Sequence, residues 1–166
     1  PQVPVLREVQ LMSEKKIKNS GMAVLMDIGE EKTIHPSDKQ SVADRLFYHA
    51  RAKTYGVADT KYAGPLYSKM KIEGNKIRLY FKFTEGGLQF KNATGKNFEI
   101  AGKDRVFYAA NVEIQGNEIV VWSDKVSNPV AARYAFKAWC TGDLYNGAGL
   151  PASSFRTDKW KIPEIK

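Results

Sequence analysis

The chain has 166 residues, of which 43% are hydrophobic and 27% are charged, a composition typical of a globular protein that can bury a core. Its formal net charge is +8, but the basic residues are spread along the chain without an arginine-rich run or a nucleic-acid motif, so we expect no nucleic-acid partner. The single cysteine, Cys140, excludes an intrachain disulfide and a metal site of paired cysteines. No stretch has the length of a membrane span and no signal peptide is visible, although the chain opens with Pro1 rather than methionine, which suggests a mature or truncated product.

The first elements are predicted to alternate between helix and strand. Residues 5–16, VLREVQLMSEKK, carry apolar residues with helical spacing. The next apolar run, from Met22 to Met26, contains no polar residue until Asp27. Such a run is typical of a parallel strand that is buried on both faces of a sheet.

A second helix is predicted over residues 39–56. Ser37 and Gln40 match a capping box at its start, and Gly56 is a natural stop. Helix, strand, loop and helix are the closing units of a doubly wound sheet, so we predict an α/β segment over residues 1–58.

Residues 59–166 have a different pattern, which begins after a polar stretch that contains Gly and Pro. In residues 76–83, KIRLYFKF, apolar side chains occupy every second position, as in a strand with one buried face. Gly-Asn pairs at 74–75 and 116–117 each separate two strand-like runs. Glycine suits the first central position of a primed hairpin turn. We therefore predict an antiparallel β-sandwich over residues 59–166.

His35 is the candidate catalytic residue. It lies in the loop after the predicted buried strand, and ligands and catalytic groups gather at that edge of open α/β sheets. An imidazole suits a general base because its ordinary pKa is near neutrality. The alternative is that His35 serves only to cap the following helix. His49 lies within that helix beside aromatic residues, and we expect it to be a packed or surface residue.

The chain offers no convincing nucleophile for such a base. It contains no G-x-S-x-G motif, and Ser153 and Ser154 lie in the β-like part, where a turn or loop role is expected. His35 and His49 are the only histidines and are poorly spaced for one metal site. The residues themselves therefore indicate half of a hydrolase and no metal.

An ordered set of segments resembles the sialate O-acetylesterase family of the SGNH hydrolase superfamily, and it covers nearly the whole chain. The segments are LREVQ (6–10), GMAVLMDIGEEKTIHPSDKQSVADRLFYHARAKTYG (21–56), AGPLYSKM (63–70), GLQF (87–90), FEIAG (98–102), NPVAARYAF (128–136) and LYNGAGLPASSFRTD (144–158). The resemblance implies that residues 1–58 are the C-terminal part of an SGNH, flavodoxin-like hydrolase domain and that residues 59–166 are a β-sandwich domain.

The resemblance also implies a function. Enzymes of this family remove O-acetyl groups from sialic acid or a related acetylated sugar by serine–histidine acyl transfer, and they need no cofactor. The family's histidine maps onto His35, whereas its nucleophilic serine belongs to an N-terminal motif that this chain lacks. The missing N-terminal part of the SGNH domain is therefore an implied partner, and a periplasmic or extracellular location is implied by the family's substrates.

The acid that orients the histidine is less clearly marked. In the superfamily an aspartate usually lies two or three residues before the histidine, and those positions are here Thr33 and Lys32. We assign Glu31 as the orienting acid. Glu30, Asp38 and a backbone carbonyl are the alternatives.

A different class of function also fits the sequence. The chain can be a non-catalytic carbohydrate-binding or scaffold module derived from such an esterase. Tyr80, Trp122 and Tyr145 would then stack on sugar rings, although packing in a core or an interface is the commoner fate of aromatic residues in strands.

Overall fold

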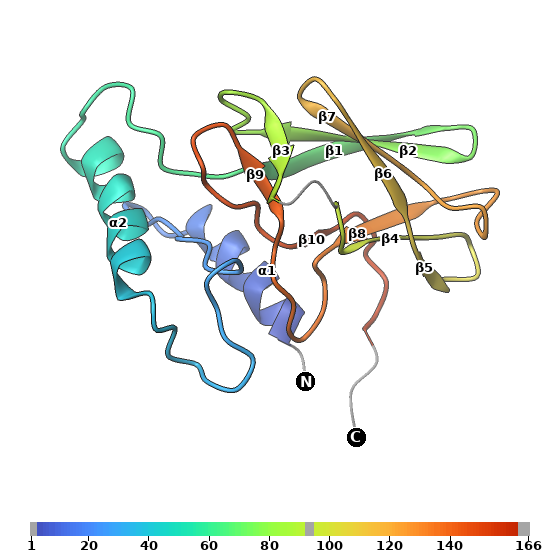
Figure 1. Ribbon diagram of the computed structural model, residues 1–166, viewed down its shortest axis with the longest axis horizontal. Coiled ribbons are helices and arrows are strands. Elements are labelled where there is room, and N and C mark those ends of the chain that lie inside the picture. Colours follow the sequence, from blue (N-terminus) through green and yellow to red (C-terminus); the bar gives the residue numbers. More distant parts are fainter. Residues whose placement is uncertain (1–2, 92–94, 163–166) are drawn as a thin grey trace.

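The computed structural model describes residues 3–91 and 95–162, so Pro1 lies outside the described residues. The helices gather at one end of the molecule and the strands at the other (Figure 1). The helical elements are α1 (Val3–Glu14), α2 (Lys39–His49) and the π-helical turn η1 (Ala50–Thr54). The strands are β1 (Leu66–Glu73), β2 (Lys76–Lys82), β3 (Leu88–Phe90), β4 (Phe98–Ala101), β5 (Phe107–Ala109), β6 (Asn111–Gln115), β7 (Glu118–Trp122), β8 (Ala131–Tyr134), β9 (Leu144–Asn146) and β10 (Phe155–Arg156).

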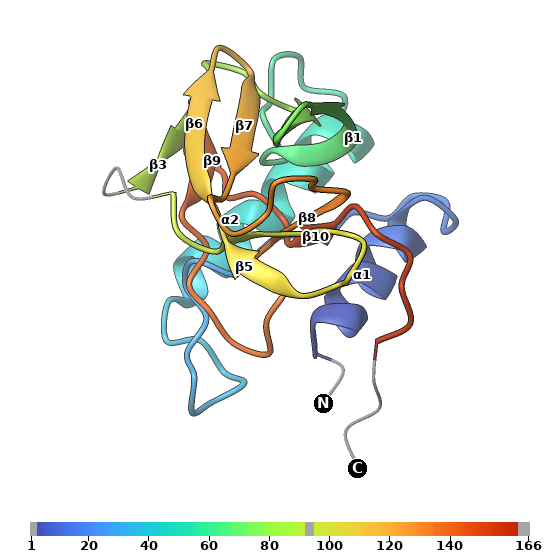
Figure 2. The ribbon, with the colours of Figure 1, turned by 90° about the vertical axis from the view of Figure 1, so that its right-hand side faces the viewer.

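These strands form antiparallel sheets around one core. Two four-stranded sheets have the orders β1-β2-β7-β6 and β10-β8-β4-β5, and β3 pairs with β9. Figure 2 shows the two four-stranded sheets one above the other. Their shared core contains the fully buried side chains of Ile77, Leu79 and Ile119 from the first sheet and Ile100 and Tyr134 from the second. Burial of a large apolar side chain contributes about 1.5–3 kcal/mol. The prediction of antiparallel strands is confirmed.

Both predicted hairpins are present. Glu73 pairs with Lys76 across the first turn, and Gln115 pairs with Glu118 across the second. The glycine at the first central position of each turn, Gly74 or Gly116, has a φ of +64° or +63°, a backbone conformation that other residues adopt only with strain.

Both predicted helices are present, but the predicted cap of the second one is wrong. Helix α2 and the turn η1 together fill residues 39–54, and the cap is Asp38. Its carboxylate accepts hydrogen bonds from the N–H of Ser41 at 2.9 Å and from the hydroxyl of Ser41 at 2.6 Å. Ser37 cannot be the cap because the helix begins at Lys39, two residues later. Its own N–H donates to Glu30 at 2.8 Å.

The predicted parallel strand over residues 22–26 is not formed in this chain. The segment has no strand beside it in the described part of the chain, and every strand pair described is antiparallel. A strand exists only as part of a ladder with a neighbour. Without a neighbour, the apolar composition that suggested a buried parallel strand cannot produce one.

The helical half (residues 3–58) packs on the β half (residues 59–91 and 95–162). The guanidinium of Arg7 in α1 donates to the carbonyl oxygen of Ala135 at 3.1 Å and to the hydroxyl of Ser154 at 3.2 Å. Glu8 pairs with Arg156 of β10 at 2.9 Å. These contacts fix helix α1 to the β half.

Candidate active site

The loop that carries His35 is anchored at its start. The carboxylate of Asp27 forms a bidentate ion pair with the guanidinium of Arg45 in α2, with nitrogen–oxygen distances of 2.6 and 2.7 Å. Their side chains are only 5% and 11% exposed, and such a planar pair fixes orientation as well as distance. Further along the loop, Glu30 pairs with Thr33 in an isolated antiparallel bridge. The loop is therefore closed on itself between residues 22–26 and helix α2.

His35 is exposed on this loop. Its backbone N–H donates to the hydroxyl of Thr33 at 3.1 Å. Its imidazole has no hydrogen bond or ion pair with any residue of the described ranges. The ring is thus accessible to a substrate or to another protein segment.

The structure does not bring a candidate acid onto the imidazole of His35. Glu30 accepts the N–H of Ser37, and this hydrogen bond lowers the pKa of its carboxyl group. Asp38 caps α2, and the hydrogen bonds from Ser41 lower its pKa. Glu31 is exposed and makes no hydrogen bond or ion pair within the described part of the chain.

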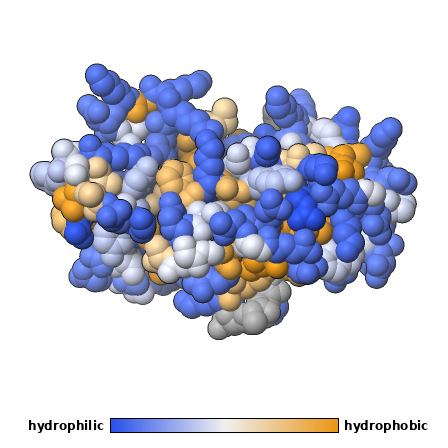
Figure 3. Space-filling model, turned by 90° about the horizontal axis from the view of Figure 1, so that it is seen from above, coloured by the Kyte–Doolittle hydropathy of each residue, from blue (hydrophilic) through white to orange (hydrophobic). Residues whose placement is uncertain are grey.

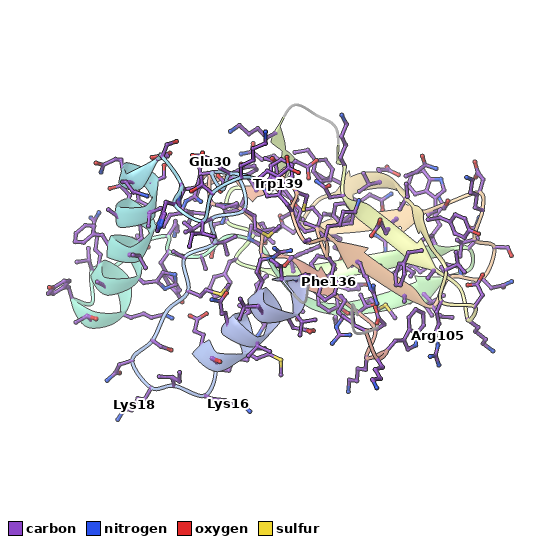
Figure 4. All side chains as sticks on the ribbon, turned by 90° about the horizontal axis from the view of Figure 1, so that it is seen from below. Lys16, Lys18, Glu30, Arg105, Phe136 and Trp139 are labelled. Atoms are coloured by element: carbon purple, nitrogen blue, oxygen red, sulfur yellow. The ribbon has the colours of Figure 1, made fainter. Side chains whose placement is uncertain are left out.

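A large open hollow of about 790 Å³ lies beside this loop. Its wall is formed by helix α1, residues 22–26, the loop that carries His35, and a turn of the β half. Ile34 and Pro36, the two neighbours of His35, line it. Trp139, which is 47% exposed, also lines the hollow, and it lies near Glu30 in the view of Figure 4. Trp139 was not predicted as part of the site, because only the tertiary fold brings it to the same hollow as the loop, which lies about a hundred positions earlier in the chain.

His49 is a packed helix residue, as predicted. It is 8% exposed, its Nε2 lies 3.1 Å from the carbonyl oxygen of Met22, and its ring lies 5.2 Å from the ring of Tyr62. Burial, with a contribution from the nearby charge of Lys53, lowers its pKa. The ring also lines a smaller cavity of about 250 Å³ between the two halves.

The predicted sugar-stacking aromatics are mostly covered. Tyr145 is 7% exposed, so its prediction as an exposed platform is wrong. The ammonium of Lys69 lies 5.0 Å from the ring centre of Tyr80, and that of Lys76 lies 4.4 Å from the ring centre of Trp122. These contacts weigh against a carbohydrate-binding module built on the three aromatics.

Metal binding, membrane insertion and an internal nucleophile find no support within residues 3–91 and 95–162. No group of three or more His, Cys, Asp or Glu side chains there could hold a metal ion. No helix there is long and apolar enough to cross a membrane. Ser153 and Ser154 are buried, and Ser154 accepts a hydrogen bond from Arg7. Neither serine is therefore presented as a nucleophile. The thiol of Cys140 lies 3.7 Å from the carbonyl oxygen of Ala135, and burial raises its pKa.

Comparisons with known proteins point to one group of enzymes. No family model matches the chain. The chain is 31% identical to a sialate O-acetylesterase of Homo sapiens over 133 residues, which are 75% of this chain and 25% of that protein. It is 36% identical to a sialate O-acetylesterase of Rattus norvegicus over 90 residues, which are 52% of this chain and 16% of that protein. The crystal structure of a carbohydrate acetylesterase from Xanthomonas citri matches with a TM-score of 0.88 and 36% identity, covering 95% of this chain and 36% of that one. The chain thus spans at most about a quarter of the length of the curated relatives that it matches.

Proposed function

Because this chain belongs to the sialate O-acetylesterase family, we propose that it is the histidine-bearing part of a carbohydrate esterase. The proposed reaction is removal of O-acetyl groups from sialic acid or a related acetylated sugar. The observation that carries the proposal is the exposure of His35 on an anchored loop whose flanking residues, Ile34 and Pro36, line the large hollow.

The chemistry that we propose is acyl transfer between a serine and this histidine. The serine would come from the part of the enzyme that this chain does not contain. As the serine attacks the acetyl carbonyl, His35 accepts its proton. The imidazolium then gives that proton to the sugar oxygen as the bond to the acetyl carbon breaks, so the sugar leaves with a free hydroxyl. Water repeats the cycle, again with His35 as base, and acetate is released. No cofactor takes part.

We propose Glu31 as the acid that orients His35 in the complete enzyme. Glu30 and Asp38 already accept hydrogen bonds that hold the loop and cap α2. Glu31 is exposed and has no such partner in the described part of the chain, so its side chain can turn toward the imidazole without breaking a contact.

The wider architecture belongs to the same proposal. The helical half would be the C-terminal part of an SGNH, flavodoxin-like domain, and the β half would be a β-sandwich domain attached to it. The partner of this chain would be the N-terminal part of the SGNH domain. The complete enzyme would act in the periplasm or outside the cell, where acetylated glycans are found.

The test is a pair of histidine variants in the complete enzyme, meaning this chain together with the part that it lacks. His35→Ala should lower the rate of acetate release from an O-acetylated sialic acid about a thousandfold or more and leave folding nearly unchanged. His49→Ala is the control and should change the rate little. Equal and mild losses in both variants would defeat the assignment of His35. Absence of any acetate release by the complete enzyme would favour a non-catalytic module instead.

A further inference from the structure

Trp139 is a large aromatic side chain that its own chain leaves half uncovered. The ring of Trp122 lies 4.4 Å from the ammonium of Lys76, and the ring of Trp160 lies 5.8 Å from that of Phe107. The indole of Trp139, by contrast, makes no aromatic or cation–π contact with any residue of the described ranges, and it is 47% exposed in the wall of the large hollow. An aromatic side chain that stays exposed in a hollow is typical of a binding surface.

The backbone next to Trp139 is held in place by Arg7 of helix α1. The guanidinium donates hydrogen bonds to the carbonyl oxygens of Ala135, Lys137 and Ala138, at 3.1, 2.5 and 3.4 Å. Ala135 has a φ of +49°, a left-handed conformation that favours glycine and that persists only where the surrounding structure holds it. Trp139 therefore follows a turn with a fixed backbone, and the free energy cost of ordering it on binding is small.

Trp139 shares the hollow with the polar part of the loop that carries His35. The side chains of residues 30–33 (Glu, Glu, Lys and Thr) are exposed and line this hollow, as do Ile34 and Pro36 on either side of His35. A sugar ring has apolar C–H faces and polar hydroxyl groups. It therefore binds where an aromatic face lies beside side chains that form hydrogen bonds.

We propose that Trp139 is the platform on which the sugar ring of the substrate stacks while its acetyl ester reaches His35. The proposal rests on the proposed function and adds a determinant of specificity to it. The acetyl group is common to all acetyl esters, whereas only a substrate with a sugar ring contacts the indole. Trp139 therefore makes the enzyme select acetylated sugars over simple acetyl esters.

The other candidate occupant of this place is a protein surface of the missing part of the enzyme. Seen from above, apolar patches interrupt an otherwise hydrophilic surface (Figure 3). Exposed apolar side chains such as Leu6 and Met12 of α1 suit a covering protein surface. Residues 30–33, which line the same hollow as Trp139, would lose their hydration against such a surface, and that loss is costly unless each polar group finds a new partner. The polar lining therefore favours a ligand rich in hydroxyl groups at Trp139.

The test compares two substrates in the complete enzyme and in its Trp139→Ala variant. With an O-acetylated sialic acid, the variant should lower kcat/KM about tenfold, mainly through a higher KM, because the stacking contact is lost. With triacetin, an acetyl ester without a ring, kcat/KM should change by less than about twofold. Trp160→Ala is the matched control, because its ring packs on Phe107, and it should leave the ratio of the two kcat/KM values unchanged.

The conservative variant Trp139→Phe keeps an aromatic ring and should restore most of the kcat/KM for the acetylated sugar. Equal losses with both substrates in Trp139→Ala would mean that the indole supports the fold or the contact between the two parts, and would overturn the platform. No loss with the acetylated sugar, or a Phe variant as impaired as the Ala variant, would also overturn it.

A binding measurement separates this proposal from the proposed function. Sialic acid is titrated into the complete enzyme while the tryptophan fluorescence is recorded, and the fluorescence should change in the unmodified enzyme but not in Trp139→Ala. Such a change without acetate release from either substrate would support the platform and defeat the esterase function. Acetate release with no fluorescence change, or with the same change in both proteins, would support the esterase and overturn the platform.

Discussion

The two halves of the molecule differ in how far each completes its own structure. In the β half, Leu79 and Ile119 are fully buried, and each strand of the four-stranded sheets has a partner. In the helical half, Leu6 and Met12 are 57% and 52% exposed. Residues 22–26 belong to no sheet in the described part of the chain. We conclude that the β half contains the partners of its own strands, whereas residues 22–26 have no neighbouring strand in the described part of the chain.

The largest expected effect compares one leucine from each half. Leu79→Ala opens a cavity in the closed core and should lower the free energy of unfolding of this chain by about 2–5 kcal/mol. Leu6→Ala removes the same atoms from an exposed face of α1 and should change it by about 0.5 kcal/mol or less. Denaturant unfolding of the two variants measures both values. A large decrease in the free energy of unfolding for Leu6→Ala would show that Leu6 is already buried in this chain, and the two halves would then not differ in this way.

A second, smaller effect concerns the contact between the segment and α2. Gly21→Ala places a methyl group against the ring of His49, and such overpacking should cost about 1–3 kcal/mol. Gly29→Ala is the matched control, because the nearest atom to its new Cβ is the carbonyl oxygen of Leu25 at 3.4 Å. The control should change the stability by about 0.5 kcal/mol or less. Thermal unfolding measures the stability of both variants. Equal stabilities would show that residue 21 tolerates a methyl group beside the ring of His49.

The smallest expected effect concerns the start of α2. Asp38→Ala removes the carboxylate that accepts from Ser41, so it should lower the melting temperature by less than Gly21→Ala does. Ser37→Ala should leave the cap intact, because the cap is Asp38. Circular dichroism on heating measures both variants. A larger loss for Ser37→Ala would restore the capping box that the sequence suggested.

Much of the fold could be predicted from local signals. The Gly-Asn turns at 74–75 and 116–117 and the alternation in β2 depend only on adjacent residues, and both hairpins are present. The first helix was predicted from apolar spacing and the second from its start and stop signals, of which the capping box was wrong. The prediction of a strand at Met22–Met26 was wrong because no neighbouring strand lies beside this segment in the described part of the chain. The exposure of Tyr145 was wrong because tertiary packing buries its side chain, and no local pattern in the sequence marks that packing.

The candidate site likewise combines features that local sequence signals mark with features that depend on tertiary contacts. The position of His35 between the apolar segment and α2 follows from the order of elements, and the structure has it exposed in that loop. Tertiary contacts place Trp139 in the wall of the hollow. They also make Arg45 and His49 the hydrogen-bond partners of residues 22–26. No pattern in the sequence marks them. The assignments of His35 as base and Glu31 as acid stay predictions.

We propose that this chain holds the histidine of an esterase and lacks its nucleophile, and one experiment tests this claim directly. The most direct measurement is the hydrolysis of p-nitrophenyl acetate by the purified chain, with heat-denatured chain as the background, before and after addition of the missing part of the enzyme. We predict a rate equal to the background for the chain alone and turnover once the two parts associate. Turnover well above the background by the chain alone would contradict the claim.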